Sequence, residues 1–238
     1  RRVLLGCDFP FGWPEGGAAA AAAALGGGAS APDRAPWRRL WAALAAAVDD
    51  GPDNANNRFE LAARINMRAF DGAGPFWGRP HQREVRGLPA RKPHGYGARY
   101  PRERRAVEGL TPRAQPVWKL YTTGSVGGQA LLGIAALERL RSAPGLAGRA
   151  AVWPFEALAP SAERPILIAE IYPSLFPPDP RAPVKDAGQV RAVAERLAQA
   201  PPERLAAALA APACAPESRA ARGEEGWILG VGPEGSTL

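Results

Sequence analysis

The chain has 238 residues and a formal net charge of +7 at pH 7, and its cysteines are limited to Cys7 and Cys214. This length fits one large domain or two small ones, and no apolar stretch approaches the roughly 20 residues that span a bilayer. Two cysteines exclude a disulfide framework and a Cys-rich zinc site, so we expect a cytoplasmic protein.

The first half of the chain predicts one strand followed by helices. Residues 2–7 are apolar and end at an Asp and a Pro, which is typical of a strand. The Ala run within 16–31 favours one or two helical turns between glycine breakers. Apolar residues at 3–4 spacing predict a helix over 36–48, and a second helix is expected over about 55–70, capped by Asp53 or Asn54.

Residues 71–105 form a long segment rich in Gly, Pro and Arg, with a helical piece predicted at its end over 101–110. Structureless loops beyond about 12–15 residues are usually functional or disordered. Between Arg79 and Arg105 the chain carries eight Arg and one Lys against two Glu, a local excess equal to the net charge of the whole chain. The segment either attracts nucleic acid or a nucleotide, or it is a solvated loop in an Arg-rich protein.

The second half alternates strands and helices. Strands are predicted at 150–156 and 165–172, the latter a continuous apolar run like a central parallel strand. Helices are predicted over 122–141, 184–200 and 201–212, "PVWKLY" suggests a short strand or extended segment, and 224–232 suggests a final strand. Alternating elements favour an α/β fold with a mainly parallel sheet. We expect a single domain over 1–238, with a helical and irregular basic insertion at about 32–112.

Three carboxylates are candidates for one site. Asp8 ends one apolar strand, Glu170 lies near the end of another, and Asp186 begins the helix that follows. If the strands are parallel, these acids approach the sheet edge where open α/β sheets bind ligands. Such a group can bind Mg²⁺ or Mn²⁺ for phosphoryl chemistry. Alternatively, Asp8 only ends a strand and Asp186 only caps a helix.

Two further clusters are candidate ligand sites. The Gly-rich turn in "WKLYTTGSVGGQALLGI" opens a helix, so its N–H groups and hydroxyls can cradle a phosphate or carboxylate. Its candidate residues are Lys119, Thr122, Thr123, Gly124 and Ser125, unless the turn is only a capped, closely packed helix start. "DGPDNANNRF" adds Asn54, Asn57 and Arg58, of which helix capping explains one or two.

The motifs "LLGCDFPFG" and "AEIYPS" resemble an uncharacterised family of predicted ribonuclease H-like nucleases. That family has a strand ending in Gly-x-Asp-x-Pro, here Gly6 to Pro10, and a later strand with Glu, an aromatic residue or His, and Pro. Over nearly the whole chain, "DFPFGWP", "DGPDNANNRF", "GPFWG", "QPVWKLYTTGSVGGQALLGI", "AEIYPSL", "KDAGQVRA" and "EEGWILG" are similar to alphaproteobacterial proteins labelled as molybdopterin guanine dinucleotide synthesis proteins.

The resemblance implies a ribonuclease H-like fold in which Asp8 and Glu170 bind Mg²⁺ together with Asp186, and Tyr172 joins the ligand site. Such folds begin with a β-hairpin whose first strand carries an essential Asp. The sequence lacks a starting Met and begins at the later strand, so we expect the hairpin to be missing, either from this sequence or from a degenerate copy.

Three functions follow as expectations. The first is a metal-dependent nuclease or phosphotransfer enzyme that binds a polyanion through the basic segment. The second is a nucleotide-handling protein in molybdenum-cofactor synthesis, using the turn and Lys119 on a pterin or nucleotide phosphate. The third is a binding protein of the same fold without turnover.

Overall fold

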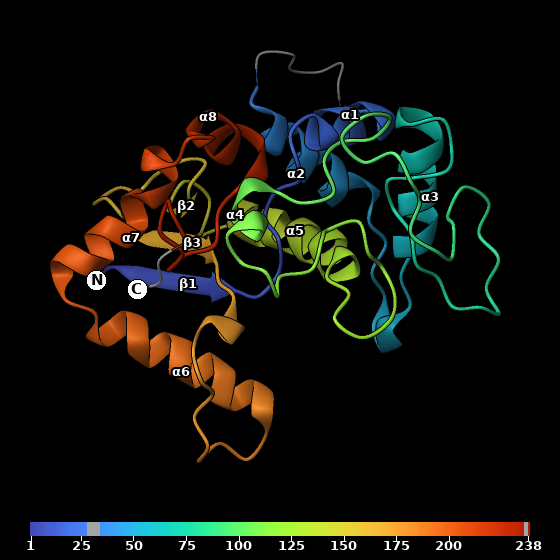
Figure 1. Cartoon of the computed structure of the whole chain (residues 1–238). Coiled ribbons are helices and arrows are strands. Elements are labelled where there is room, and N and C mark those ends of the chain that lie inside the picture. Colours follow the sequence, from blue (N-terminus) through green and yellow to red (C-terminus); the bar gives the residue numbers. More distant parts are fainter. Residues whose placement is uncertain (28–33, 236–237) are drawn as a thin grey trace.

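Figure 1 shows the computed structural model of the chain, which describes residues 1–27, 34–235 and 238. The strands are β1 (Val3–Cys7), β2 (Ala150–Val152) and β3 (Ile166–Glu170). They form one sheet in which every pair is parallel and β3 lies between β1 and β2. The predicted strands at 2–7 and 165–172 are confirmed, the one at 150–156 forms over its first three residues and then turns, and the α/β fold with a parallel sheet flanked by helices is confirmed.

Helices make up much of the remaining structure. The longer ones are α1 (Gly17–Ala24), α2 (Pro36–Ala47), α3 (Arg58–Ala69), α5 (Gly127–Ser142), α6 (Lys185–Gln199) and α7 (Pro202–Cys214). Short elements are α4 (Ala106–Gly109), α8 (Ser218–Ala220), the 3₁₀ turns η1 (Pro52–Asn54) and η2 (Pro173–Leu175), and the π-helical turn η3 (Ala221–Glu225). Within the described ranges, no helix is both long and apolar enough to cross a bilayer.

The sheet separates two apolar cores. Because neighbouring strand residues point to opposite faces, Ile168 of β3 packs into one core and Leu167 into the other. The larger core joins Ile168 to α1, α2, α3 and α5. The smaller core joins Leu167 to α7 and to the apolar segment 227–231 near the C-terminus. The helices therefore flank both faces of the sheet, as expected for a parallel sheet.

The segment expected to be an insertion contributes directly to the larger core. Trp37 and Trp41 of α2, Phe59 of α3 and Phe76 of the irregular segment are buried there with Ile168. The Trp41 indole N–H donates to the carbonyl of Phe11, at 2.8 Å, which ties α2 to the chain just after β1. This segment shares one core with the sheet.

Two expected extended segments do not form strands. "PVWKLY" is a loop that makes an isolated bridge between Trp77 and Lys119. In the segment 224–232, the first two residues are the end of η3 and the chain then turns. Gly226 has a φ of 72°, a left-handed conformation that breaks an extended chain. The apolar run after Gly226 is buried, as a strand would be, but it follows an irregular path.

β1 lies at an open edge of the sheet. Val3, Leu4 and Leu5 are 48%, 37% and 39% exposed, whereas β3 is largely buried. Within the described part of the chain, β1 pairs only with β3, and α6 runs beyond its outer edge (Figure 1). The expected N-terminal hairpin stays a prediction.

Candidate functional site at the carboxyl edge of the sheet

The parallel register brings the ends of β1 and β3 together. Cys7 is aligned with Glu170, so Asp8 and Glu170 lie at the same edge of the sheet. Both line a small cavity of 40 Å³, together with Tyr172 and with Gln115 from the loop before α5. The structure thus brings together Asp8, Glu170 and Tyr172, as the two strand-end motifs predict. The cavity is too small for a nucleobase, so a larger ligand has to bind across its open side.

The charge of Asp186 acts on Asp8 although 177 residues lie between them in the sequence. Partial burial raises the pKa of Asp8 above its usual value, and the nearby charge of Asp186 raises that pKa further. Asp186 belongs to the first turn of α6. A bound cation would offset the unfavourable effect of the Asp186 charge on the Asp8 carboxylate.

The Glu170 carboxylate forms a buried ion pair with Arg105. Its two carboxylate oxygens accept hydrogen bonds from the Arg105 guanidinium at 2.6 and 2.7 Å, and one of them also accepts the Phe11 N–H at 3.0 Å. The side chains of Arg105 and Glu170 are 1% and 4% exposed. Glu170 therefore fixes the end of β3 to the loop after β1, and its predicted role as a metal ligand would require this ion pair to open.

Arg105 connects three segments of the chain through its guanidinium. It binds Glu170, donates through Nε to the Glu108 carboxylate at 2.7 Å, and donates to the Glu225 carbonyl at 2.9 Å. Burial by itself would lower the pKa of Arg105, but the charges of Glu170 and Glu108 outweigh burial and raise it. Arg105 therefore stays charged. Sequence reasoning missed this role, for which the only local signal is the three-residue spacing of Arg105 and Glu108.

The described residues contain no group of three or more His, Cys, Asp or Glu side chains placed to hold a metal ion. Glu170 does not fit such a role in this conformation, because Arg105 and Phe11 already satisfy its oxygens. Asp8 lines the cavity and experiences the charge of Asp186, so these two carboxylates are the remaining candidates for holding a cation. Mg²⁺ is commonly bound by one or two carboxylates, with waters and substrate phosphates as its other ligands.

The Gly-rich turn closes on itself beside the cavity. The Lys119 ammonium donates to the Thr123 carbonyl at 2.9 Å, and the Gly127 N–H donates to the Lys119 carbonyl at 2.9 Å. Thr122 and Gly124 have positive φ and are exposed, with Ser125 half-buried. Val126, at the end of the turn, lines the cavity. The turn thus lies next to the site, but Lys119 and the Gly127 N–H already have partners within it.

Asn54, Asn57 and Arg58 do not line the cavity. The Asn57 side chain donates to the carbonyl of Ala47 and to Asp49, which joins the end of α2 to the start of α3. Asn57, rather than Asp53 or Asn54, lies at the N-cap of α3. Arg58 donates to Asn56 at 2.7 Å and lies against the ring of Phe59. Each observed contact is structural, and binding by these residues stays a prediction.

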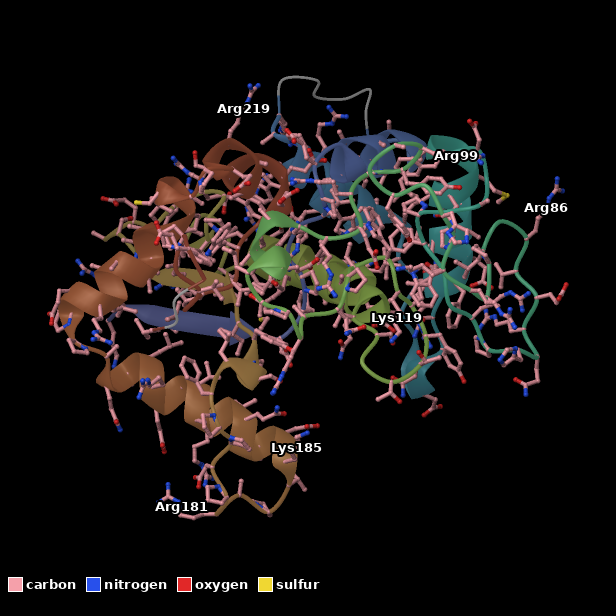
Figure 2. All side chains as sticks on the ribbon, viewed as in Figure 1. Arg86, Arg99, Lys119, Arg181, Lys185 and Arg219 are labelled. Atoms are coloured by element: carbon pink, nitrogen blue, oxygen red, sulfur yellow. The ribbon has the colours of Figure 1, made fainter. Side chains whose placement is uncertain are left out.

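The positive charge of the basic segment is partly neutralised by acidic side chains inside and outside it. Ion pairs join Arg79 to Glu84, Arg83 to Glu60, Lys92 to Glu103, Arg102 to Glu225, and Arg105 to Glu108 and Glu170. Figure 2 shows Arg86 and Arg99 at the periphery, far from Lys185 at the start of α6. Of the segment's cations, all of which the structure describes, Arg105 alone lines the cavity at the carboxyl edge, where it is paired with Glu170, and polyanion binding by the segment stays a prediction.

Glu224 occupies the glycine-bounded start of α1. Its carboxylate accepts the N–H groups of Gly16, Ala18 and Ala19 at 2.7–3.0 Å. Burial raises the pKa of Glu224, and these three hydrogen bonds oppose that rise. The carboxylate thus supplies the acceptors that the first N–H groups of a helix otherwise lack.

Comparison of the sequence with models of protein families finds no match, and comparisons with curated proteins and with solved structures find none either.

Proposed function

We propose that the chain is a metal-dependent phosphoryl-transfer enzyme of ribonuclease H-like fold, acting on phosphate esters of nucleotides or nucleic acid. The observation that carries this proposal is the position of Asp8 in the cavity at the carboxyl edge of the sheet, where the charge of Asp186 also acts on it. In open α/β sheets, ligands bind outside the carboxyl ends of the strands.

Each side chain at the edge has a distinct role in this proposal. Asp8 and Asp186 would hold Mg²⁺ or Mn²⁺, which supplies a Lewis acid for a phosphoryl oxygen when bound. Glu170 and Arg105 keep the ends of β1 and β3 at a fixed spacing, since Glu170 also accepts the Phe11 N–H. Tyr172 lines the cavity beside Asp8, where it is available to contact the ligand.

Hydrolysis of bis(p-nitrophenyl) phosphate in the presence of Mn²⁺ tests this proposal. We expect Asp186→Asn to lower the rate at least about tenfold, because a lost cation ligand is worth more than about 1.4 kcal/mol. Glu195→Gln is the matched control, since it removes one negative charge from an exposed position on the same helix. Equal rates in Asp186→Asn and Glu195→Gln would contradict the proposal.

A binding protein without turnover is the second candidate. The observation that favours it is the complete engagement of Glu170 by Arg105, which leaves two carboxylates rather than three to hold a metal. Under this alternative, Asp8 and Asp186 still bind Mn²⁺, but the wild-type chain does not hydrolyse the phosphodiester.

A further inference from the structure

A groove of 410 Å³ lies between η2 and the first turns of α6. Arg113 forms part of one wall, Ser174 belongs to η2, and Lys185 and Gln189 lie one turn apart on α6. Leu175, Phe176 and two prolines complete the lining. The groove thus combines two cations, a hydroxyl and an amide from three separate segments of the chain.

The two cations of the groove lack acidic partners. In the described ranges, neither Arg113 nor Lys185 forms an ion pair, and both are exposed. Other cations near this end of α6 differ, because Arg181 and Arg191 bind the Asp179 carboxylate at 2.9 and 3.1 Å. The available positive charge in this region is therefore concentrated at the groove.

Residues of the groove are also close in sequence to residues of the candidate site. Ser174 is two residues after Tyr172, which lines the cavity, and Lys185 directly precedes Asp186. The N-cap residue of α6, Val184, provides no side-chain hydrogen bond, and helix N-termini carry a partial positive charge that adds to that of Lys185. A group held in this groove would lie beside the first turn of α6, which carries Asp186.

We propose that this groove binds a phosphate group of the substrate through Arg113 and Lys185. A guanidinium binds phosphate through paired N–H groups and an ammonium binds it as a compact charge, and the Ser174 hydroxyl adds a donor. Only the assignment of this phosphate to the substrate rests on the proposed function. Phosphate binding by the groove stands on the groove residues alone.

Calorimetric titration of the full chain with inorganic phosphate, in EDTA and at low salt, tests the groove without any metal. We expect the double variant Arg113→Gln/Lys185→Gln to raise the Kd at least about tenfold, since a hydrogen bond to a charged group typically contributes that much. The matched control is Arg86→Gln/Arg219→Gln, which removes the same charge from exposed sites far from the groove (Figure 2). The control should change the Kd less than about threefold, the effect of lost long-range attraction.

A second variant tests whether phosphate binding weakens because of charge, rather than because the side chains of Arg113 and Lys185 no longer pack in the groove. Ser174→Glu keeps both cations and places a negative charge inside the groove, so phosphate binding should again weaken at least about tenfold. Equal weakening in the groove and control pairs, or no phosphate binding by the wild-type chain, would overturn the proposal. Failure of Mn²⁺ binding with intact phosphate binding would instead overturn the proposed function.

The source of the phosphate is resolved by two further probes. Guanosine 5′-monophosphate and a short single-stranded oligonucleotide are titrated against the wild-type chain and the groove variant. If the groove variant binds only the oligonucleotide more weakly, the phosphate belongs to a nucleic-acid backbone. If it binds both probes more weakly, the groove accepts any phosphate ester. If neither weakens, the groove does not hold a substrate phosphate.

Discussion

Replacing Arg105 by Met is expected to lower the free energy of unfolding by about 3–5 kcal/mol, the usual cost of removing one partner of a buried ion pair. The reason is that Glu170 and Glu108 would both remain buried without their cation. Arg105 is 2% exposed, so water cannot readily replace the guanidinium. Urea unfolding followed by tryptophan fluorescence measures the change.

Arg102→Met is the matched control for Arg105. The Arg102 side chain is 47% exposed and makes a single ion pair, with Glu225 at 3.0 Å. Glu225 is buried, but it also accepts the Glu15 and Ala106 N–H groups at 2.8 Å, so losing the half-exposed Arg102 should cost only about 1 kcal/mol. The double variant Arg105→Met/Glu170→Leu should recover part of the lost stability, because no unpaired carboxylate then remains at position 170. A loss in Arg105→Met no larger than that in Arg102→Met would show that the ion pair does not hold the sheet edge together.

Replacing Glu224 by Ala is expected to destabilise the fold by about 2–4 kcal/mol, because each buried N–H left without an acceptor costs about 1–3 kcal/mol. Three N–H groups at the start of α1 lose their acceptor in this variant, those of Gly16, Ala18 and Ala19. α1 packs against α2 and α3 in the larger core, so the loss extends beyond α1.

The variant Glu224→Gln separates the contribution of the hydrogen bonds to stability from that of the negative charge. Its amide keeps one oxygen that can accept the Ala18 and Ala19 N–H groups, so its destabilisation should be less than half of that in Glu224→Ala. Thermal unfolding followed by circular dichroism compares the two variants. Equal unfolding temperatures for Glu224→Ala and the wild-type chain would show that α1 does not depend on this carboxylate.

Local patterns in the sequence predict most of the elements. The 3–4 spacing of Trp37, Trp41 and Leu44 predicts α2, and all three side chains are buried. The apolar run 165–172 predicts β3, the central strand. Parallel pairing then places Asp8 and Glu170 at one edge, because strands of one direction end on the same side. These predictions depend only on neighbouring residues and strand direction.

The roles of Glu170 and Glu224 could not be predicted, because each side chain binds a partner that is distant in the sequence. Glu170 in an apolar run suggests a metal ligand, but its cation comes from Arg105, 65 positions earlier in an irregular segment. The run after Glu225 suggests a strand, but Glu224 is tied to α1 more than 200 positions away. Neither contact has a periodic signal, since each is set by how irregular segments fold over the sheet.

Calorimetric Mn²⁺ titration of the wild-type chain, Asp8→Asn and Glu170→Gln, each first checked by thermal unfolding, tests the metal site directly. We expect Asp8→Asn to weaken Mn²⁺ binding at least about tenfold, because one of two charged ligands is lost. We expect Glu170→Gln to keep an affinity close to wild type while unfolding at a lower temperature, since Arg105 loses one of its two carboxylate partners. Unchanged affinity in Asp8→Asn, or loss of Mn²⁺ binding in a folded Glu170→Gln variant, would rule out a metal site built on Asp8 without Glu170.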